Sequence, residues 1–521
     1  MNVADLLTRA AAARPGHTAA IASGERLTFG QWWQRSCALS ERIRSLGLPE
    51  RSHIALLFEN SIEYLISFFA VFQAGHVAVP LDTSLAPDKL NDIIKDSEAV
   101  VLFVQGRFRR HLAKIVEGNE SVRHLFSDKP LSGVIDWIPG ETIGDIIASA
   151  DTIPLPDAPD ESAFAESGRH DLAAIFYTSG STGVSKGVML SHGNLVSNTL
   201  ATVEYLRLTE RDSVMVILPF YYIYGNSLLL THVACGGSLI IDNRFMYPEV
   251  VLDAMEEHQA TGFSGVPSHF MILLNGSSFV KRKLEHLRYF TQAGGAMAPE
   301  VIRQLIDAFG HKEIFIMYGQ TEAAPRVTWL PPERLVDKLG SIGVEVPGVT
   351  VEILDESGMP VPVNQTGELV VSGPNVMMGY FKQPEETAQV LKGGKLYTGD
   401  LARKDEDGYY FITGRRREII KSGGNRVSAK EVEERILEHE RVAEVAVFGV
   451  PDNILGEAIK AVIVTKNGGT LSEKDIQTHC QKTLAVHKIP RFVVFVDSLP
   501  KLQSGKVNKL LLKEQHASGV V

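Results

Sequence analysis

A run of small and hydroxylated residues follows the strand-like segment 173–177. It consists of Thr178, Ser179, Gly180, Ser181, Thr182, Gly183, Val184, Ser185, Lys186 and Gly187. Small residues let a backbone turn tightly and bring its N–H groups close to an anion, while hydroxyls and a lysine supply further donors. The composition is typical of a loop that binds nucleotide phosphates, although a flexible linker has a similar composition.

The spacing of this run differs from that of the two best-known nucleotide loops. A Walker loop places its lysine directly after its second glycine, whereas here Gly183 stands three residues before Lys186. The Gly-x-Gly-x-x-Gly pattern of dinucleotide-binding loops does not fit either. Because the run lies between an apolar strand and the helical pattern of residues 194–206, where a linker has no role, we favour phosphate binding.

Charged side chains that could act on a nucleotide occur in several later segments. A carboxylate such as that of Glu322 approaches a triphosphate easily only when a divalent cation neutralises the charge. Asp400 follows Gly399 and can accept two hydrogen bonds from a vicinal diol such as that of ribose. Lys506 lies in a loop of small residues near the C-terminus. Taken singly, each of these residues is more often a solvated surface group.

Together these segments resemble, in order, the motifs of the adenylate-forming superfamily, which contains acyl-CoA synthetases, peptide-synthetase adenylation domains and beetle luciferases. The matching segments are residues 177–187, 318–322, 397–401, 414–431 and 500–506. Any one match could be chance, but all of them in register make coincidence a poor explanation. In character the chain is most similar to an acyl-CoA synthetase.

The resemblance implies a role for each motif residue. Glu322 would hold Mg²⁺ on the ATP phosphates, Thr321 would contact the α-phosphate, and Lys186 would belong to the phosphate loop. Lys506 would stabilise the charge that develops between the substrate carboxylate and the α-phosphate. The nucleotide-binding set would be Thr178, Ser179, Gly180, Ser181, Thr182, Gly183, Gly294, Gly295, Ala296, Tyr318 (against adenine), Gly319, Gln320, Asp400 and Arg415.

The segment after Arg415 resembles the family's hinge and the start of its lid. Arg417 stands at the hinge position, where the lid would rotate between two half-reactions. Gly423 and Gly424 would line a tunnel for the pantetheine thiol. The alternative for Arg417 is an ordinary basic strand end.

The acid pocket is expected from an aromatic segment, in which apolar rings carry polar tips. Its residues are Phe220, Tyr221, Tyr222, Tyr224 and Gly225. Tyr222 stands where the family usually carries a histidine, so the gating role of that position does not transfer directly. The segment has no aspartate that could hold an α-ammonium group. Arg326 could pair with a second acidic group of the substrate, or it could be structural.

Apolar runs that alternate with helical patterns predict an α/β fold, with sheets covered by helices. The expected helices are 29–46 and 61–75, and the expected strands include 53–58, 99–104, 214–219 and 237–241. Residues 1–416 form the predicted large N-terminal domain that binds ATP and the acid. Residues 417–521 form a small mobile α+β lid, with helices from 428 and at 472–485 and strands 442–450, 457–465 and 492–496.

Composition excludes several classes of function. The 521 residues carry a net charge of −10, which disfavours nucleic acid and anionic membranes as partners. Three cysteines far apart and the absence of paired histidine spacing argue against a disulfide framework or a zinc site. With neither a signal-peptide pattern nor a membrane-spanning run, we expect a cytoplasmic monomer or homodimer.

The sequence thus predicts an ATP- and Mg²⁺-dependent acid–thiol ligase. It would convert a carboxylic acid to acyl-AMP and pyrophosphate, and then to a thioester of coenzyme A. One alternative is a free-standing adenylation enzyme that loads the acyl group onto the pantetheine of a carrier protein. A more distant alternative is a nucleotide-binding protein without catalysis.

Overall fold

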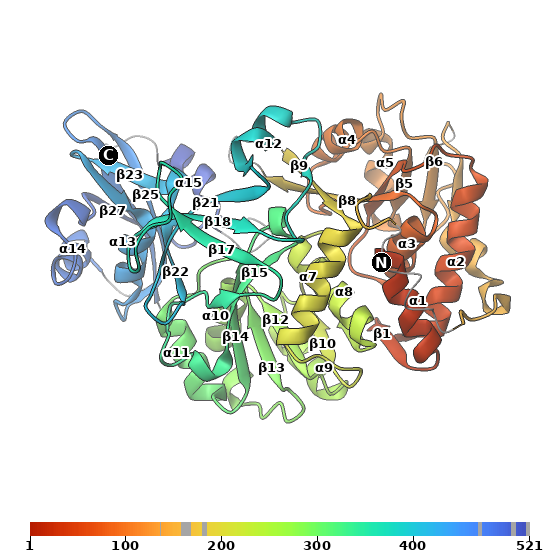
Figure 1. Ribbon diagram of the computed structural model, residues 1–521, viewed down its shortest axis with the longest axis horizontal. Coiled ribbons are helices and arrows are strands. Elements are labelled where there is room, and N and C mark those ends of the chain that lie inside the picture. The colour runs from red at the N-terminus through yellow and green to blue at the C-terminus, as the bar shows by residue number, and fades with distance from the viewer. Residues whose placement is uncertain (136, 158–167, 180–184, 467–470, 502–506, 517–521) are drawn as a thin grey trace.

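The computed structural model describes residues 1–135, 137–157, 168–179, 185–466, 471–501 and 507–516. It has a mixed α/β architecture in which a large N-terminal domain is followed by a small C-terminal domain, drawn in blue at one end of the molecule (Figure 1). The predicted fold class is confirmed. In the described part of the chain, no helix is both long enough and apolar enough to cross a membrane.

One sheet of the large domain carries the phosphate-loop segment at one end. Its strand order is β19-β9-β8-β4-β3-β5-β6-β7. The bounds are β3 (His53–Leu57), β4 (Val77–Pro80), β5 (Val101–Val104), β6 (His124–Ser127), β7 (Gly140–Thr142), β8 (Leu172–Ser179), β9 (Ser185–Ser191) and β19 (Gly379–Tyr380). Strands β3 to β8 run parallel, and β9 returns antiparallel to β8. The buried parallel strands explain the continuous apolar runs of the sequence.

A second sheet carries the adenine-side and acidic motifs. Its order is β16-β15-β14-β13-β12-β10-β11-β1-β2. The bounds are β1 (Thr18–Ala22), β2 (Glu25–Thr28), β10 (Ser213–Val216), β11 (Ser238–Ile241), β12 (Gly262–Gly265), β13 (Tyr289–Gln292), β14 (Glu313–Gly319), β15 (Arg326–Leu330) and β16 (Val344–Glu345). Its central strands are parallel and its edges antiparallel.

Helices cover these sheets. They are α1 (Val3–Ala13), α2 (Phe29–Ser45), α3 (Ile62–Gln73), α4 (Pro87–Asp96), α5 (Leu112–Ile115), α6 (Ile143–Ile147), α7 (His192–Tyr205), α8 (Ile223–Cys235), α9 (Pro248–Glu257), α10 (Pro267–Gly276), α11 (Pro299–Phe309) and α12 (Pro384–Val390). The side chains of Thr28, Ser61 and Ser191 cap α2, α3 and α7 by accepting hydrogen bonds from backbone N–H groups of the first turn. The helices predicted at 29–46 and 61–75 are confirmed as α2 and α3.

A third, antiparallel sheet of the large domain was not predicted. It contains β17 (Thr350–Leu354), β18 (Gly367–Ser372), β20 (Leu391–Lys392), β21 (Lys395–Lys404) and β22 (Tyr410–Arg415). Most positions of β21 and β22 are only partly buried. These strands therefore lack the unbroken apolar runs on which the sequence argument depended. It carries Asp400 and Arg415 to the domain boundary.

The small domain has its own core. Its strands are β23 (Ile419–Ser422), β24 (Asn425–Ser428), β25 (Val442–Asp452), β26 (Gly456–Thr465) and β27 (Phe492–Phe495), and its helices are α13 (Ala429–Leu437), α14 (Glu473–Gln481) and α15 (Lys509–Gln515). The predicted α13, β25, β26, α14 and β27 are confirmed, while the β23–β24 hairpin and α15 were missed. The apolar cluster of the large domain extends to Ile412, and that of the small domain starts at Ile420.

Candidate functional site

Asp400 lies at the junction of the two domains with both carboxylate oxygens engaged. The Tyr318 hydroxyl donates to Asp400 Oδ2 at 2.6 Å, and Arg415 Nε donates to Oδ1 at 2.7 Å. The β21–β22 register places Asp400 opposite Arg415, so strand pairing itself creates this ion pair. Each carboxylate oxygen can accept a further hydrogen bond. Three residues that the sequence assigned to nucleotide binding therefore converge at one point.

Tyr318 reaches Asp400 from the end of β14, where the chain turns tightly. A Cβ atom on the neighbouring Gly319 would lie 1.9 Å from the carbonyl oxygen of Pro325, so only glycine fits there. Burial, and then the Asp400 charge, raise the pKa of Tyr318 well above its usual value. The phenol therefore stays neutral and donates its proton to the carboxylate.

Glu322 and Lys186 meet through a residue that the sequence did not indicate, Tyr380. The Tyr380 hydroxyl donates to Glu322 Oε1 at 2.8 Å, and Lys186 Nζ lies 4.8 Å from the centroid of the Tyr380 ring. Burial, followed by the charge of Glu322, raises the pKa of Tyr380, and the positive charge of Arg417 partly offsets this rise. Arg417 is thus close enough to affect this group.

Strand β19 holds Tyr380 between the two motifs. It pairs with β9, and Phe381 N donates to Gly187 O at 2.8 Å. A few residues earlier, Met377 N donates to the carbonyl oxygen of Glu322 at 2.9 Å. A lone tyrosine in a two-residue strand has no distinctive spacing, so no sequence signal could have assigned it to the site.

The residues present fit a magnesium ion held mainly by phosphates. Within the described ranges, no group of three or more His, Cys, Asp or Glu side chains could form a metal site by itself. Mg²⁺ commonly binds through one or two carboxylates together with substrate phosphates and water. Glu322 supplies one such carboxylate, and its second oxygen accepts no hydrogen bond from the part of the chain that the structure describes.

The residues that flank the phosphate segment pair as antiparallel strands. Strands β8 and β9 pair Thr178 with Lys186 and Ser179 with Ser185. Strand β9 was not predicted, and α7 begins only after it. Gly180, Ser181, Thr182 and Gly183 lie outside the described residues, so their expected phosphate contacts stay predictions.

The loop that was predicted to lie beside adenine follows β13. Gly294 has a positive φ of 84°, and the next two residues, Gly295 and Ala296, are exposed. The buried Gln292 donates from Nε2 to Gly295 O at 2.8 Å, which fixes the loop to the strand end. The buried amide nitrogen Nε2 of Gln320 has no hydrogen-bond partner within the described chain.

The side chains of the aromatic segment, which precedes and begins α8, point in different directions. Phe220 packs into the core against Tyr64, with ring centroids 5.5 Å apart. The Tyr222 hydroxyl donates to Asp82 Oδ2 at 2.9 Å, and the Tyr224 hydroxyl donates to Thr291 O at 3.0 Å. Tyr221 lies against Tyr222, with ring centroids 4.8 Å apart.

Gly225 lies in the first turn of α8, where the helix closely approaches the backbone of Pro219. A Cβ atom there would lie 2.1 Å from Pro219 O, so any side chain would displace the backbone. Of the predicted pocket residues, Phe220 is fully buried and Tyr224 is 8% exposed. Tyr224 is therefore better placed than Phe220 to line an acid pocket.

The lid residues are arranged as follows. Arg417 lies in a short 3-10 segment, Arg416–Glu418, between the domains. Gly423 and Gly424 form the exposed turn of the β23–β24 hairpin, both with positive φ, a conformation that glycine adopts readily. Lys506 lies outside the described residues.

Lys509, at the start of α15, forms an ion-pair cluster beside the hinge. Its Nζ lies 2.7 Å from Glu418 Oε2 and 2.9 Å from Glu433 Oε1. Glu418 directly follows Arg417, so α15 is tied to the first turn of the small domain. This cluster could not be predicted from local patterns, because its members are far apart in the chain.

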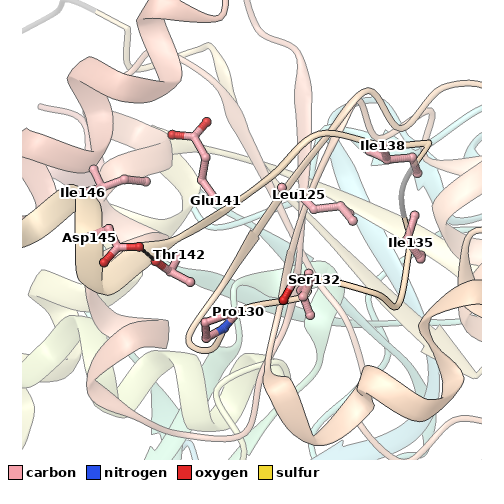
Figure 2. Close-up of a pocket in the computed structure, with 11 residues that line it drawn as sticks. Leu125, Pro130, Ser132, Ile135, Ile138, Glu141, Thr142, Asp145 and Ile146 are labelled. Carbon is pink, nitrogen blue, oxygen red and sulfur yellow. Dashed lines mark hydrogen bonds between the residues drawn. The ribbon is translucent and has the colours of Figure 1, made fainter.

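A separate cavity of about 620 Å³ lies at the opposite end of the first sheet, next to β7 (Figure 2). It is lined by Leu125, Ile135, Ile138 and Ile146 together with polar groups that include Glu141 and Asp145. Because β7 forms one edge of the sheet and β9 lies next to the opposite edge strand, β19, this cavity belongs to a different region from the site.

Comparisons with known proteins agree with this geometry. A family model described as "AMP-binding enzyme" matches residues 7–381, and one described as "AMP-binding enzyme C-terminal domain" matches residues 431–506. A long-chain-fatty-acid–CoA ligase of Yersinia pestis is 33% identical over 99% of this chain and 94% of its own length. A feruloyl-CoA synthase of an Amycolatopsis species is 34% identical over 96% of each. The ATP-bound structure of MatB from Rhodopseudomonas palustris has a TM-score of 0.87 and 31% identity over 99% of each chain.

Proposed function

Since this chain belongs to the AMP-binding enzyme family and is an adenylate-forming ligase of the acyl-CoA synthetase type, we propose that it activates a carboxylic acid with ATP and transfers the acyl group to coenzyme A. The observation that carries the proposal is the convergence of Tyr318 and Arg415 on Asp400, at the boundary between the domains. A buried carboxylate with fixed donors and free acceptor capacity suits the ribose of ATP.

In the first half-reaction, a carboxylate oxygen of the acid attacks the α-phosphorus of ATP, and the bond to pyrophosphate breaks. Asp400 and Arg415 hold the ribose, while Lys186 and the hairpin loop hold phosphates. Mg²⁺, when bound, would supply positive charge to the phosphates, with Glu322 as its protein ligand. Thr321 contacts the α-phosphate, and Lys506 stabilises its developing charge.

In the second half-reaction, the thiol of coenzyme A loses its proton to solvent and its sulfur attacks the acyl carbon. AMP leaves with the electron pair of the broken bond on its phosphate oxygen. We propose that the large domain ends at residue 416 and that the lid rotates about Arg417 between the two steps. The separation of the hydrophobic clusters at Ile412 and Ile420 supports a boundary there. The turn at Gly423 and Gly424 would then approach the pantetheine arm.

The two candidate acyl acceptors are coenzyme A and the pantetheine of a carrier protein. The two relatives compared above are described as a CoA ligase and a CoA synthase, which favours coenzyme A for this chain. The two descriptions name different acids, and the two proteins are about equally similar to this chain. They therefore do not indicate which acid this chain uses.

The test measures pyrophosphate release over a panel of carboxylic acids, followed by thioester formation with coenzyme A or a holo-carrier protein. Asp400→Ala should raise the KM for ATP at least about 10-fold, because the ribose would lose a charged acceptor. Asp405→Ala is the matched control, since Asp405 follows Asp400 by a few residues but pairs with Lys338 and not with the proposed nucleotide-binding residues. Folded wild-type protein that binds ATP but releases no pyrophosphate with any acid would favour the non-catalytic alternative.

A further inference from the structure

Arg326 is a buried arginine at the start of β15, with only 2% of its surface exposed. Its backbone is held on both sides. Arg326 N donates to Asn198 Oδ1 at 3.0 Å, and Arg326 O accepts from Asn198 Nδ2 at 2.8 Å and from Asn375 Nδ2 at 3.1 Å. These contacts fix where the side chain starts, so its guanidinium is confined to a defined region.

The guanidinium of Arg326 stacks on the aromatic segment that precedes and begins α8. Its central carbon lies 4.2 Å from the centroid of the Tyr224 ring. Burial raises the pKa of Tyr224 and of Tyr205, and in both cases the charge of Arg326 opposes that rise. Both phenols stay neutral at physiological pH, so neither supplies a counter-charge.

Arg326 has no acidic partner in the described ranges, and its buried Nε has no hydrogen-bond partner there. Other arginines of the same domain are paired. Arg288 forms ion pairs with Asp212 and Glu313 while it also stacks on Tyr289, at 4.6 Å. Arg282 contacts several carboxylates around α9.

A buried cation without a counter-ion is unfavourable, because the lost hydration of the charge is not replaced. Stacking on a tyrosine ring replaces only part of it. A guanidinium also presents several N–H donors in a planar fork that matches a carboxylate. An anionic group from a ligand would complete this environment.

The position of Arg326 connects the two parts of the proposed site. The β14–β15 register places it opposite Gly319, in the motif expected to contact nucleotide. Glu322 lies in the segment that connects these two strands. Its guanidinium covers Tyr224, in the segment expected to line the acid pocket. An acid whose first carboxylate faces the α-phosphate would extend toward this region.

We propose that Arg326 determines substrate specificity by binding a second anionic group of the acid, so that the preferred substrates are dicarboxylic acids. The inference rests on the proposed function and deepens it. The hydroxyl groups around Tyr224 support a polar end to the pocket: Tyr224 contacts Thr291, whose Oγ1 lies 2.6 Å from Ser264 Oγ. A terminal carboxylate suits this environment better than a terminal methyl group.

The test uses acid pairs of equal length: butyrate and succinate, hexanoate and adipate, octanoate and suberate. The quantity measured is the ratio of kcat/KM for the dicarboxylic acid to that for the monocarboxylic acid, from pyrophosphate release. For at least one pair, the wild-type ratio should exceed one. Arg326→Met should lower that ratio about 100-fold, as expected when one partner of a buried charge pair is removed.

Arg288→Met is the matched control, since it removes an arginine that stacks on a tyrosine but has its own carboxylates. It should leave the ratio unchanged. Arg326→Lys keeps the charge and loses the planar fork, so its ratio should fall between those of the wild type and Arg326→Met. This variant also serves if Arg326→Met does not fold.

Three outcomes would overturn the inference. If the wild type prefers the monocarboxylic acid in every pair, the inference about Arg326 is wrong, while the proposed function still holds. Equal losses for both members of a pair in the Arg326 variants would assign the residue to structure. No pyrophosphate release from any acid would overturn the proposed function and this inference with it.

Discussion

The hydroxyl of Tyr380 donates a 2.8 Å hydrogen bond to the carboxylate of Glu322, while Lys186 lies over the face of the same ring. Tyr380 comes from a strand of two residues that pairs with the phosphate-loop hairpin. It therefore connects the lysine of one nucleotide motif to the glutamate of another. The orientation of Glu322 depends on this contact, because the phenol donor fixes one of its oxygens.

We expect Tyr380→Phe to slow adenylate formation about 10-fold and to raise the Mg²⁺ concentration needed for half-maximal rate, since a hydrogen bond to a charged group is lost. Glu322→Ala should abolish adenylate formation. Tyr410→Phe is the control, because the Tyr410 hydroxyl also donates to a glutamate, Glu345, but outside the site. Titration of the pyrophosphate-release rate with Mg²⁺ checks this. An unchanged Mg²⁺ requirement in Tyr380→Phe, or near-normal activity of Glu322→Ala at low Mg²⁺, would contradict the role of Glu322.

Lys506→Ala should separate the two half-reactions. Acyl-adenylate formation should slow by about 10²–10³-fold, the typical loss for one preorganised charge-stabilising donor. Transfer from synthetic acyl-adenylate to thiol should stay near the wild-type rate, because the rotated lid would move Lys506 away from the reacting atoms. Single-turnover measurements of each step check this, and equal losses in both would rule out lid rotation.

Gly424→Trp should block thioester formation and leave adenylate formation largely intact, because the thiol tunnel would need close approach of the backbone. Gly394→Trp is a matched control: it also has a positive φ, in an exposed hairpin turn of the large domain. It should affect neither step beyond any loss of stability. If Gly424→Trp makes thioester at the full rate, or accumulates no acyl-adenylate, the tunnel assignment is wrong.

The stability of the protein should fall as the pH drops below about 6.5. Burial lowers the pKa of His192 and of His232 to about 4 from the usual 6.5. Between these pKa values the unfolded chain binds protons that the folded protein does not. Each histidine should therefore lower the free energy of unfolding by about 2 kcal/mol between pH 7 and pH 5.

Urea unfolding at the two pH values measures this effect. His192→Gln should show a smaller difference between pH 7 and pH 5 than the wild type. Substitution of the exposed His311 by Gln should leave the difference unchanged. A wild-type free energy of unfolding that is equal at both pH values would contradict the prediction.

Local patterns predicted much of the fold. Buried parallel strands such as β3 and β5, and capped helices such as α2 and α3, have periodicities that depend on residues close in the chain. The separate small domain could be predicted for the same reason, whereas the role of the motif around Glu322 was predicted from its resemblance to the adenylate-forming superfamily. The antiparallel sheet that contains β21 and β22 could not be predicted, because partly buried positions obscure its pattern.

Long-range contacts account for what the sequence missed in the site. Tyr380 reaches the site because β19 pairs with β9. Lys509 binds carboxylates that precede it by many residues in the chain. Arg326 could be identified as a candidate, but that no carboxylate of the described ranges pairs with it depends on how β15 packs against α7 and α8. Spacing within a single chain does not encode such proximity.

The tight β14–β15 turn also restricts how this enzyme could evolve. Because a Cβ atom on Gly319 would clash with Pro325 O, a substitution at Gly319 would shift the nucleotide motif and Arg326 together. If specificity for a new acid evolved through substitutions in this turn, ATP binding would be lost as well. Viable mutational paths should instead pass through Tyr224, which lies on a different element, so variation there should accumulate first.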